Sequence, residues 1–195
     1  TKTAGVVIDW FRRECAPGQS LAELDRMAAG VSPGADNLTF LPHFDGTISP
    51  VPNQSARGAI YGLTLQHTRG AIYRAILEAL AFSLRENLEL LERGGFPFDT
   101  IRSLGGGANS DIWLQIKADA TGHAIEKPSV TEAAIKGAAM LAAYGMGAFP
   151  SLAECSAAFY QSAKRFTPDP ANRAAYDAAF RRYRELKRIC YGEGA

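Results

Sequence analysis

The chain has 195 residues, which is long enough for one domain with a substantial hydrophobic core. Its hydrophobic content of 47% and charged content of 21% are those of a globular protein. The net charge of +1 gives no electrostatic case for binding nucleic acid or an anionic membrane surface. No apolar run approaches the ~20 residues that a membrane-spanning helix needs.

The cysteines and histidines are scattered along the chain. Cys15, Cys155 and Cys190 are odd in number, and no pair has the two-residue spacing typical of zinc or redox motifs. Unpaired thiols are usual in the reducing cytoplasm, so we expect a cytoplasmic protein without a structural metal. The first residue is Thr rather than Met, and the chain opens inside an apolar segment at residues 4–11. We therefore expect it to be a piece of a longer protein.

The first 68 residues are predicted to form short elements. We expect helices at residues 4–13 and 20–29, followed by strands at residues 38–44 and 59–65. Ser20 is expected to cap the second helix, because Glu23 follows three positions on in the pattern of a capping box. Residues 46–58 are rich in Pro, Ser and Asn, and we expect a loop there.

A long helix is predicted next, capped by Thr68 and running over residues 69–92. Its apolar side chains recur every three or four positions: Ile72, Ile76, Leu80, Leu84, Leu88 and Leu91. One flank carries the small residues Ala75, Ala79 and Ser83, so that another element can pack close. Two interpretations of this flank stay open, an oligomer contact such as a homodimer and ordinary core packing.

The rest of the chain is predicted to be mostly helical. A strand at 101–104 leads into three glycines and a helix at 110–121. After it we expect a strand at 124–126 and then helices at 131–144, 151–163 and 171–189. The pattern is α/β with a helical C-terminal half. Its strands are few and short for a free-standing sheet, so we expect further strands upstream of residue 1.

The glycine loop is the place where the sequence indicates chemistry rather than packing. Gly105, Gly106 and Gly107 lack a Cβ, so a flat or charged ligand can approach their backbone closely. The helix that follows directs its free N–H groups and the positive end of its dipole toward the loop. Such a loop suits a nucleotide, although a tight turn without a ligand has the same composition.

Several segments in order resemble one known family. The first is a Leu-Pro-His-Phe-Asp-Gly loop at 41–50, and the second is a pattern around the start of the long helix, at 56–63 and 67–78. The glycine loop with its helix follows at 105–115, and two further motifs lie at 132–139 and 166–170. These resemble the C-terminal domain of the FGGY carbohydrate kinases, with 105–115 similar to the family's adenine-binding motif. The resemblance covers essentially the whole chain, so we expect one domain over residues 1–195.

The resemblance implies the C-terminal lobe of a ribonuclease H-like, actin-like ATPase fold, helix-rich and without its first strands. It implies a parent enzyme that phosphorylates a sugar or polyol hydroxyl with Mg-ATP. A pentulose such as xylulose is the leading substrate, because such members are common. In the family the sugar site and the catalytic carboxylate lie in the N-terminal lobe. We therefore assign no catalytic residue here, expect that lobe to hold most of the Mg²⁺ contacts, and expect the chain alone to be inactive.

On this resemblance the chain should hold the adenine and ribose half of the ATP or ADP site. The residues expected to contact the nucleotide are Gly106, Gly107, Ala108, Asn109 and Asp111. For Asn109, Ser110 and Asp111 an equal alternative is helix capping, which such residues do routinely.

Two other functions are weighed beside this one. The chain can instead be a non-catalytic nucleotide-binding or interaction module that acts only with its missing lobe. A dinucleotide-dependent oxidoreductase is disfavoured, because the loop lacks the G-x-G-x-x-G spacing after a first strand. Trp10 and Trp113 are expected in the core rather than stacked on a ligand, and His67 is expected to be a structural hydrogen-bonding residue.

Overall fold

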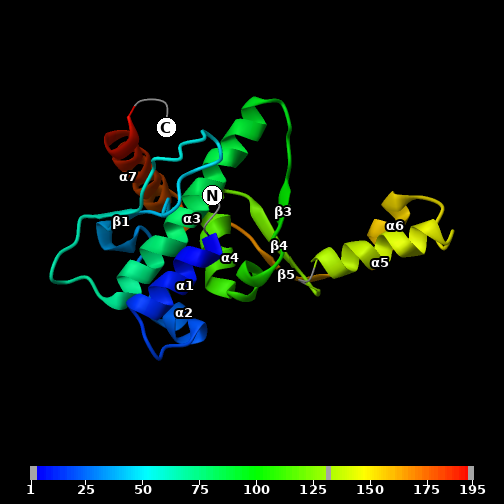
Figure 1. Ribbon diagram of the computed structural model, residues 1–195, viewed down its shortest axis with the longest axis horizontal. Coiled ribbons are helices and arrows are strands. Elements are labelled where there is room, and N and C mark those ends of the chain that lie inside the picture. Colours follow the sequence, from blue (N-terminus) through cyan, green and yellow to red (C-terminus); the bar gives the residue numbers. More distant parts are fainter. Residues whose placement is uncertain (1–3, 131–132, 193–195) are drawn as a thin grey trace.

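The computed structural model describes residues 4–130 and 133–192. In chain order these residues form α1 (Ala4–Glu14), α2 (Leu21–Ala29), η1 (Ala35–Asn37), β1 (Thr39–Leu41), β2 (Ala59–Tyr61), α3 (Arg69–Arg93), β3 (Thr100–Arg102), η2 (Gly106–Asn109), α4 (Asp111–Thr121), β4 (Ala124–Pro128), α5 (Ala133–Gly145), α6 (Leu152–Phe159), β5 (Ser162–Phe166), η3 (Pro170–Asn172) and α7 (Arg173–Tyr191). Figure 1 shows a helical body around α3 and an arm, α5 and α6, that projects from it.

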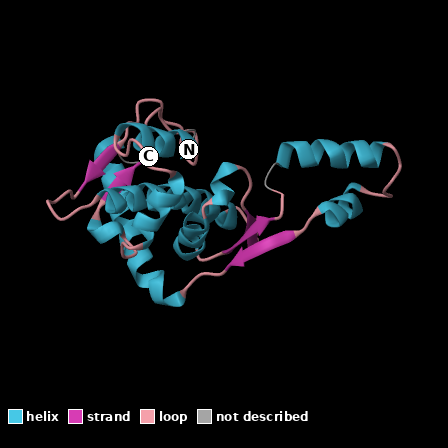
Figure 2. Ribbon diagram, turned by 90° about the horizontal axis from the view of Figure 1, so that it is seen from below, coloured by secondary structure: helices cyan, strands magenta, loops and turns pink. Residues whose placement is uncertain are grey.

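The strands form two small sheets (Figure 2). β1 and β2 pair antiparallel. In the second sheet, of order β3-β4-β5, β3 runs parallel and β5 antiparallel to β4. Leu114 and Ala118 of α4 pack against this sheet through Ile125 and Phe166. Within the described residues β3 has a neighbour on one side only, so its other edge is open to a further strand.

Helix α3 is the centre of the body. The Thr68 side chain caps it as expected, accepting a hydrogen bond from the Ala71 N–H. The small flank of α3 is buried, with Ala75, Ala79 and Ser83 each at most 3% exposed. Core packing therefore accounts for this flank, because neighbouring helices approach α3 closely there.

A buried ion pair on α3 ties together segments that are far apart in the chain. The Arg74 and Glu78 side chains, 2.8 Å apart, are both almost completely buried. Arg74 also donates to the Ala28 carbonyl of α2 at 3.0 Å and to the Tyr176 hydroxyl of α7 at 2.9 Å. Glu78 accepts the Gly34 N–H at 3.0 Å. Burial raises the pKa of Glu78, while the Arg74 charge opposes that shift.

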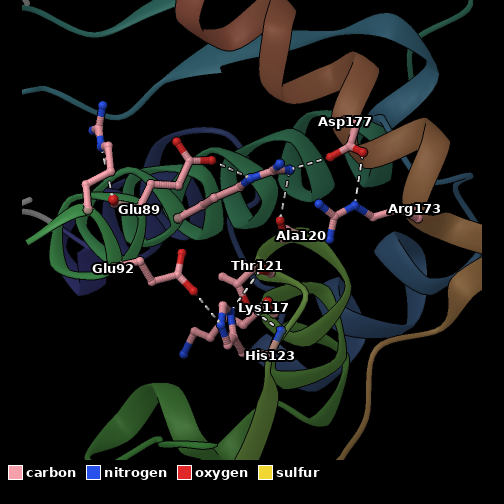
Figure 3. Close-up of polar contacts among 10 residues, drawn as sticks. Glu89, Glu92, Lys117, Ala120, Thr121, His123, Arg173 and Asp177 are labelled. Carbon is pink, nitrogen blue, oxygen red and sulfur yellow. Dashed lines mark hydrogen bonds and ion pairs between the residues drawn. The ribbon is translucent and has the colours of Figure 1, made fainter. Parts of the chain in front are cut away.

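A second polar cluster joins α3, α4 and α7, and Figure 3 shows its Asp177 and Ala120 at the meeting point of these helices. Arg85 of α3 donates to Asp177 at 2.7 Å, to the Ala120 carbonyl at 3.2 Å and to Glu89 at 3.0 Å. Arg173 holds the other oxygen of Asp177 at 2.9 Å. The Arg85 guanidinium thus donates to a free carbonyl at the C-terminal end of α4 and also holds α7 beside that end.

The helix predicted at 151–163 is wrong over its last four residues, 160–163. Helix α6 ends at Phe159, and Ser162–Phe166 is strand β5 on the free edge of β4. Two side chains fix this edge, since Tyr160 and Arg165 both hydrogen-bond to Glu126 of β4, at 2.5 and 2.8 Å. These partners lie over 30 residues away, so no local pattern reveals the strand. Thr131 and Glu132, where the preceding helix was expected to begin, lie outside the described residues.

The arm is inserted between the antiparallel strands β4 and β5 (Figures 1 and 2). Its helix α5 has no buried residue, although nearly all of its side chains are apolar. Ile135 and Leu141 are 71% and 63% exposed. Among the described residues, no helix combines the length and the hydropathy required to cross a bilayer.

The central ion pair generates a stability prediction. We expect Glu78→Gln to lower the free energy of unfolding by about 3–5 kcal/mol, because it leaves the Arg74 charge buried without a counter-charge. Urea denaturation followed by circular dichroism measures this. The matched control is Glu185→Gln, which removes an exposed pair with Arg188 and should barely move the midpoint. Equal midpoints for the two variants would contradict the role given to Glu78.

Candidate functional site

The glycine loop joins the end of β3 to the start of α4. Gly105 has φ of 72°, a left-handed conformation that favours glycine. Residues Gly106–Asn109 then form one 3-10 turn, and the Ser110 side chain caps α4 by accepting the Trp113 N–H at 3.2 Å. The expected strand, loop and helix are therefore confirmed, and capping is confirmed for Ser110.

Gly106 and Gly107 have different surroundings. A Cβ on Gly107 would lie 2.7 Å from the Trp113 ring, so the indole packs directly on that backbone. A Cβ on Gly106 would meet no protein atom within 4 Å. Gly107 is thus required by packing, while Gly106 leaves space that the protein does not fill.

That space belongs to a cavity of about 590 Å³ between the loop and the first two helices. Its walls come from α1, α2, α3, the loop and α4: Gly5, Ile8, Asp9, Leu21, Ala22, Asp25, Tyr73, Leu104, Gly106, Gly107, Asn109, Ser110, Trp113 and Lys117. The walls are largely apolar and carry a few polar groups, an arrangement typical of sites for small organic ligands. Figure 1 shows α1, α2 and α4 gathered beside α3 at this position.

The structure brings together some of the five residues expected to contact a nucleotide. Gly106, Gly107 and Asn109 line the cavity. Ala108, within the same turn, is completely buried and is not part of the cavity lining. Asp111 instead pairs with two lysines outside the cavity lining, Lys164 at 2.7 Å and Lys127 at 3.2 Å. The hydrogen bond from Lys164 is the main reason that the pKa of Asp111 is lowered.

Sequence reasoning missed Asp25 and Tyr73, two polar residues that line the cavity. The Tyr73 hydroxyl donates to Asp25 at 3.3 Å, and the Ser110 side chain is a second hydrogen-bonding partner of that carboxylate. Burial raises the pKa of Asp25 despite these two bonds. Asp25 belongs to α2, Tyr73 to α3 and Ser110 to the α4 cap. No local sequence motif therefore predicts that these three residues meet.

Lys117 was missed as well. Its Nζ lies 3.9 Å from the centre of the Trp113 ring and 3.3 Å from the Ser103 hydroxyl. Burial lowers the pKa of Lys117 to about 8. Within the described residues no carboxylate pairs with it. The four-residue spacing of Trp113 and Lys117 on α4 was the available signal, since it places both on one face of a helix.

The remaining candidates have structural roles. Trp113 is 7% exposed and donates its indole N–H to the Leu77 carbonyl, so it is a core residue whose face also forms part of the cavity. His67 accepts the Thr64 N–H at Nδ1 and contacts the Asp36 carbonyl through Nε2, which confirms a structural histidine. In the part of the chain that the structure describes, no group of three or more His, Cys, Asp or Glu side chains is placed to hold a metal ion.

Comparisons with known proteins test the fold and the family of the chain. Residues 1–146 match the family described as "FGGY family of carbohydrate kinases, C-terminal domain". Over 186 residues the chain is 37% identical to the xylulose kinase of Bacillus subtilis, covering 95% of this chain and 37% of that protein. A crystal structure of ligand-bound xylulose kinase from Lactobacillus acidophilus is similar with a TM-score of 0.88 at 26% identity, covering 97% of this chain and 38% of the other.

A crystal structure of Plasmodium falciparum glycerol kinase with ADP is similar too. Its TM-score is 0.79 at 26% identity, over 94% of this chain and 37% of that one. The chain thus spans less than two fifths of the length of these relatives. The neighbours confirm the expected actin-like ATPase fold and its C-terminal lobe. The chain belongs to the FGGY family of carbohydrate kinases.

Proposed function

We propose that the chain is the nucleotide-binding lobe of a kinase that transfers the terminal phosphoryl group of ATP to a sugar or polyol hydroxyl. The observation that carries the proposal is the cavity beside Gly106, with largely apolar walls, unfilled space over a glycine backbone and the partly buried cation Lys117. The ADP named for the Plasmodium falciparum glycerol kinase structure supports a nucleotide in this lobe. The Bacillus subtilis xylulose kinase supports xylulose as the leading substrate.

The cavity walls suggest how the nucleotide lies. A flat purine fits between the apolar side chains of α1 and α2, such as Ile8 and Leu21, and the backbone at Gly106 and Gly107. The Asn109 side chain is within the lining and offers both a donor and an acceptor to the base or ribose. Lys117, a cation without a carboxylate partner among the described residues, suits the anionic part of the ligand.

Phosphoryl transfer also needs Mg²⁺, a base for the acceptor hydroxyl and the sugar itself. Mg²⁺ prefers a few carboxylates together with phosphate oxygens, and the described residues provide no carboxylate cluster for it. The described residues therefore do not form a Mg²⁺ site of their own. We propose that the sugar, the catalytic base and most contacts to Mg²⁺ belong to the rest of the kinase.

The arm supports the idea that this lobe works with further polypeptide. Apolar surfaces as continuous as that of α5 are normally covered by another protein surface. Ile135, Leu141 and Met146 are all more than 60% exposed, and the neighbouring edge of β3 is open. About three fifths of the length of the Bacillus subtilis xylulose kinase lies outside the part that this chain matches. We propose that the corresponding part of the kinase covers the arm and extends the sheet.

The alternative is a non-catalytic nucleotide-binding module. It predicts the same cavity and the same nucleotide binding, and differs only in whether sugar is ever phosphorylated. Activity in the presence of the remaining kinase lobe is therefore the observation that separates them.

Gly106→Ala tests the nucleotide site without disturbing the fold. We expect at least about a tenfold loss of ADP affinity, because the new Cβ occupies the space proposed for the ligand. Isothermal titration calorimetry measures the affinity, and thermal unfolding should be unchanged, since no protein atom lies within 4 Å of that Cβ. Gly145→Ala on α5 is the matched control, with equally open space but far from the loop. Equal ADP affinity in the two variants would contradict the assignment.

Lys117 makes the proposed phosphate contact dependent on pH. Its pKa of about 8 means that it loses its proton as the pH rises through 8, whereas a bound anion favours the charged form and raises that pKa. We expect ADP affinity to fall about tenfold between pH 7 and 9.5, with adenosine affinity unchanged, because one pKa unit corresponds to a factor of ten. Lys117→Met should remove the dependence.

Lys127→Met is the control for that titration, because Lys127 pairs with Asp111 outside the cavity lining. It should keep the pH dependence of the wild type. A wild-type affinity for ADP that stays flat from pH 7 to 9.5 would mean that Lys117 does not meet the phosphates.

The requirement for further polypeptide is tested by co-expression. We expect the chain alone to form no xylulose phosphate from xylulose and ATP, and activity to appear when it is co-purified with the N-terminal three fifths of the Bacillus subtilis xylulose kinase. Leu141→Asp on the exposed face of α5 should prevent co-purification while leaving the melting temperature unchanged, since Leu141 is 63% exposed. Phosphorylation by the isolated chain would contradict the proposal.

A further inference from the structure

Two carboxylates line the proposed nucleotide cavity, and their surroundings differ. Asp9 on α1 is 64% exposed at its side chain and lies 3.7 Å from the Arg12 guanidinium, as a solvated pair does. Asp25 on α2 is half-buried and is held by hydroxyl groups from two other helices. A carboxylate kept in an apolar wall is costly, and such groups are commonly found where they recognise a ligand.

The hydrogen bonds around Asp25 fix its orientation. The Ser110 oxygen already accepts the Trp113 N–H, so its own proton is free to go to Asp25. The Tyr73 hydroxyl donates to the same carboxylate, and the Tyr73 ring is 2% exposed and stacked on Phe11. Two donors use about half of the acceptor positions of a carboxylate. The remaining positions are available to whatever enters the cavity.

The neighbours of Asp25 in the cavity are suited to a ring. Leu21 and Ala22 precede it on α2, and Ile8 of α1 lies in the same wall. Gly106 and Gly107 of the loop line the same cavity without side chains. A flat heterocycle that enters this cavity can present its edge, where the exocyclic groups are, to the Asp25 carboxylate.

Resting on the proposed function, we propose that Asp25 selects adenine over 6-oxopurines. The carboxylate accepts a hydrogen bond from the 6-amino group of adenine. In guanine and hypoxanthine an oxygen stands at the same position, and two acceptors face each other without a proton between them. A site built around one hydrogen bond rejects the wrong partner strongly, because its buried polar group is then left unpaired.

The test compares ADP with inosine diphosphate, whose ring differs from that of ADP only at the 6-substituent and the protonation of N1. Isothermal titration of the chain should give an affinity for ADP at least about tenfold higher than for inosine diphosphate. In Asp25→Asn the amide can donate to a 6-oxygen, so this ratio should fall to near one or invert. Asp9→Asn is the matched control, and it should keep the wild-type ratio whatever it does to the two affinities.

Each outcome bears on one of the two proposals. Equal wild-type affinities for the two nucleotides, or an unchanged ratio in Asp25→Asn, would overturn the role of Asp25 and leave the nucleotide site intact. Binding of neither nucleotide by the wild type would overturn the proposed site and the role of Asp25 together. If Asp25→Asn melts early, Asp25→Ser provides the second variant, since it keeps an acceptor for Tyr73 and removes the charge.

Discussion

The buried pair of Arg74 and Glu78 on α3 is the constraint on which the rest of the structure depends. Each charge is shielded from water, so each needs all of its hydrogen bonds to be satisfied. The partners come from the end of α2, from the turn at Gly34 and from Tyr176 on α7. These segments are drawn to one point on one helix. Their packing around α3 then creates the apolar core of the body.

The proposed site follows from that packing. Tyr73, the residue before Arg74, extends from α3 to Asp25, while Leu77 accepts the Trp113 indole N–H and thereby seats α4. The position of Trp113 in turn requires glycine at 107, because its ring occupies the place of a Cβ. The cavity is therefore bounded by groups whose positions are set by the core. Such rigid support is what the proposed recognition of a purine edge by Asp25 requires.

Local signals predicted much of this fold, and tertiary contacts account for what they missed. The caps at Ser20, Thr68 and Ser110 and the glycine loop depend on neighbouring residues, so the sequence was sufficient for them. Strand β5 depends on pairing with β4, and Asp25 and Lys117 belong to the site only because α2 and α4 meet there. For Asp111 the local motif predicted a nucleotide contact, but tertiary contacts pair its carboxylate with Lys127 and Lys164.

The lobe is thus proposed to supply a largely apolar pocket for the base and ribose, in which Lys117 contacts the phosphates of the nucleotide. The exposed arm and the open edge of β3 are proposed to meet the part of the kinase that holds the sugar. A crystal structure of the chain soaked with ADP would locate the nucleotide. We expect the purine beside Asp25 and over Gly106. Density for ADP at another place, such as the cleft at the base of the arm that is lined by Arg102, Lys136 and Tyr160, would contradict this location.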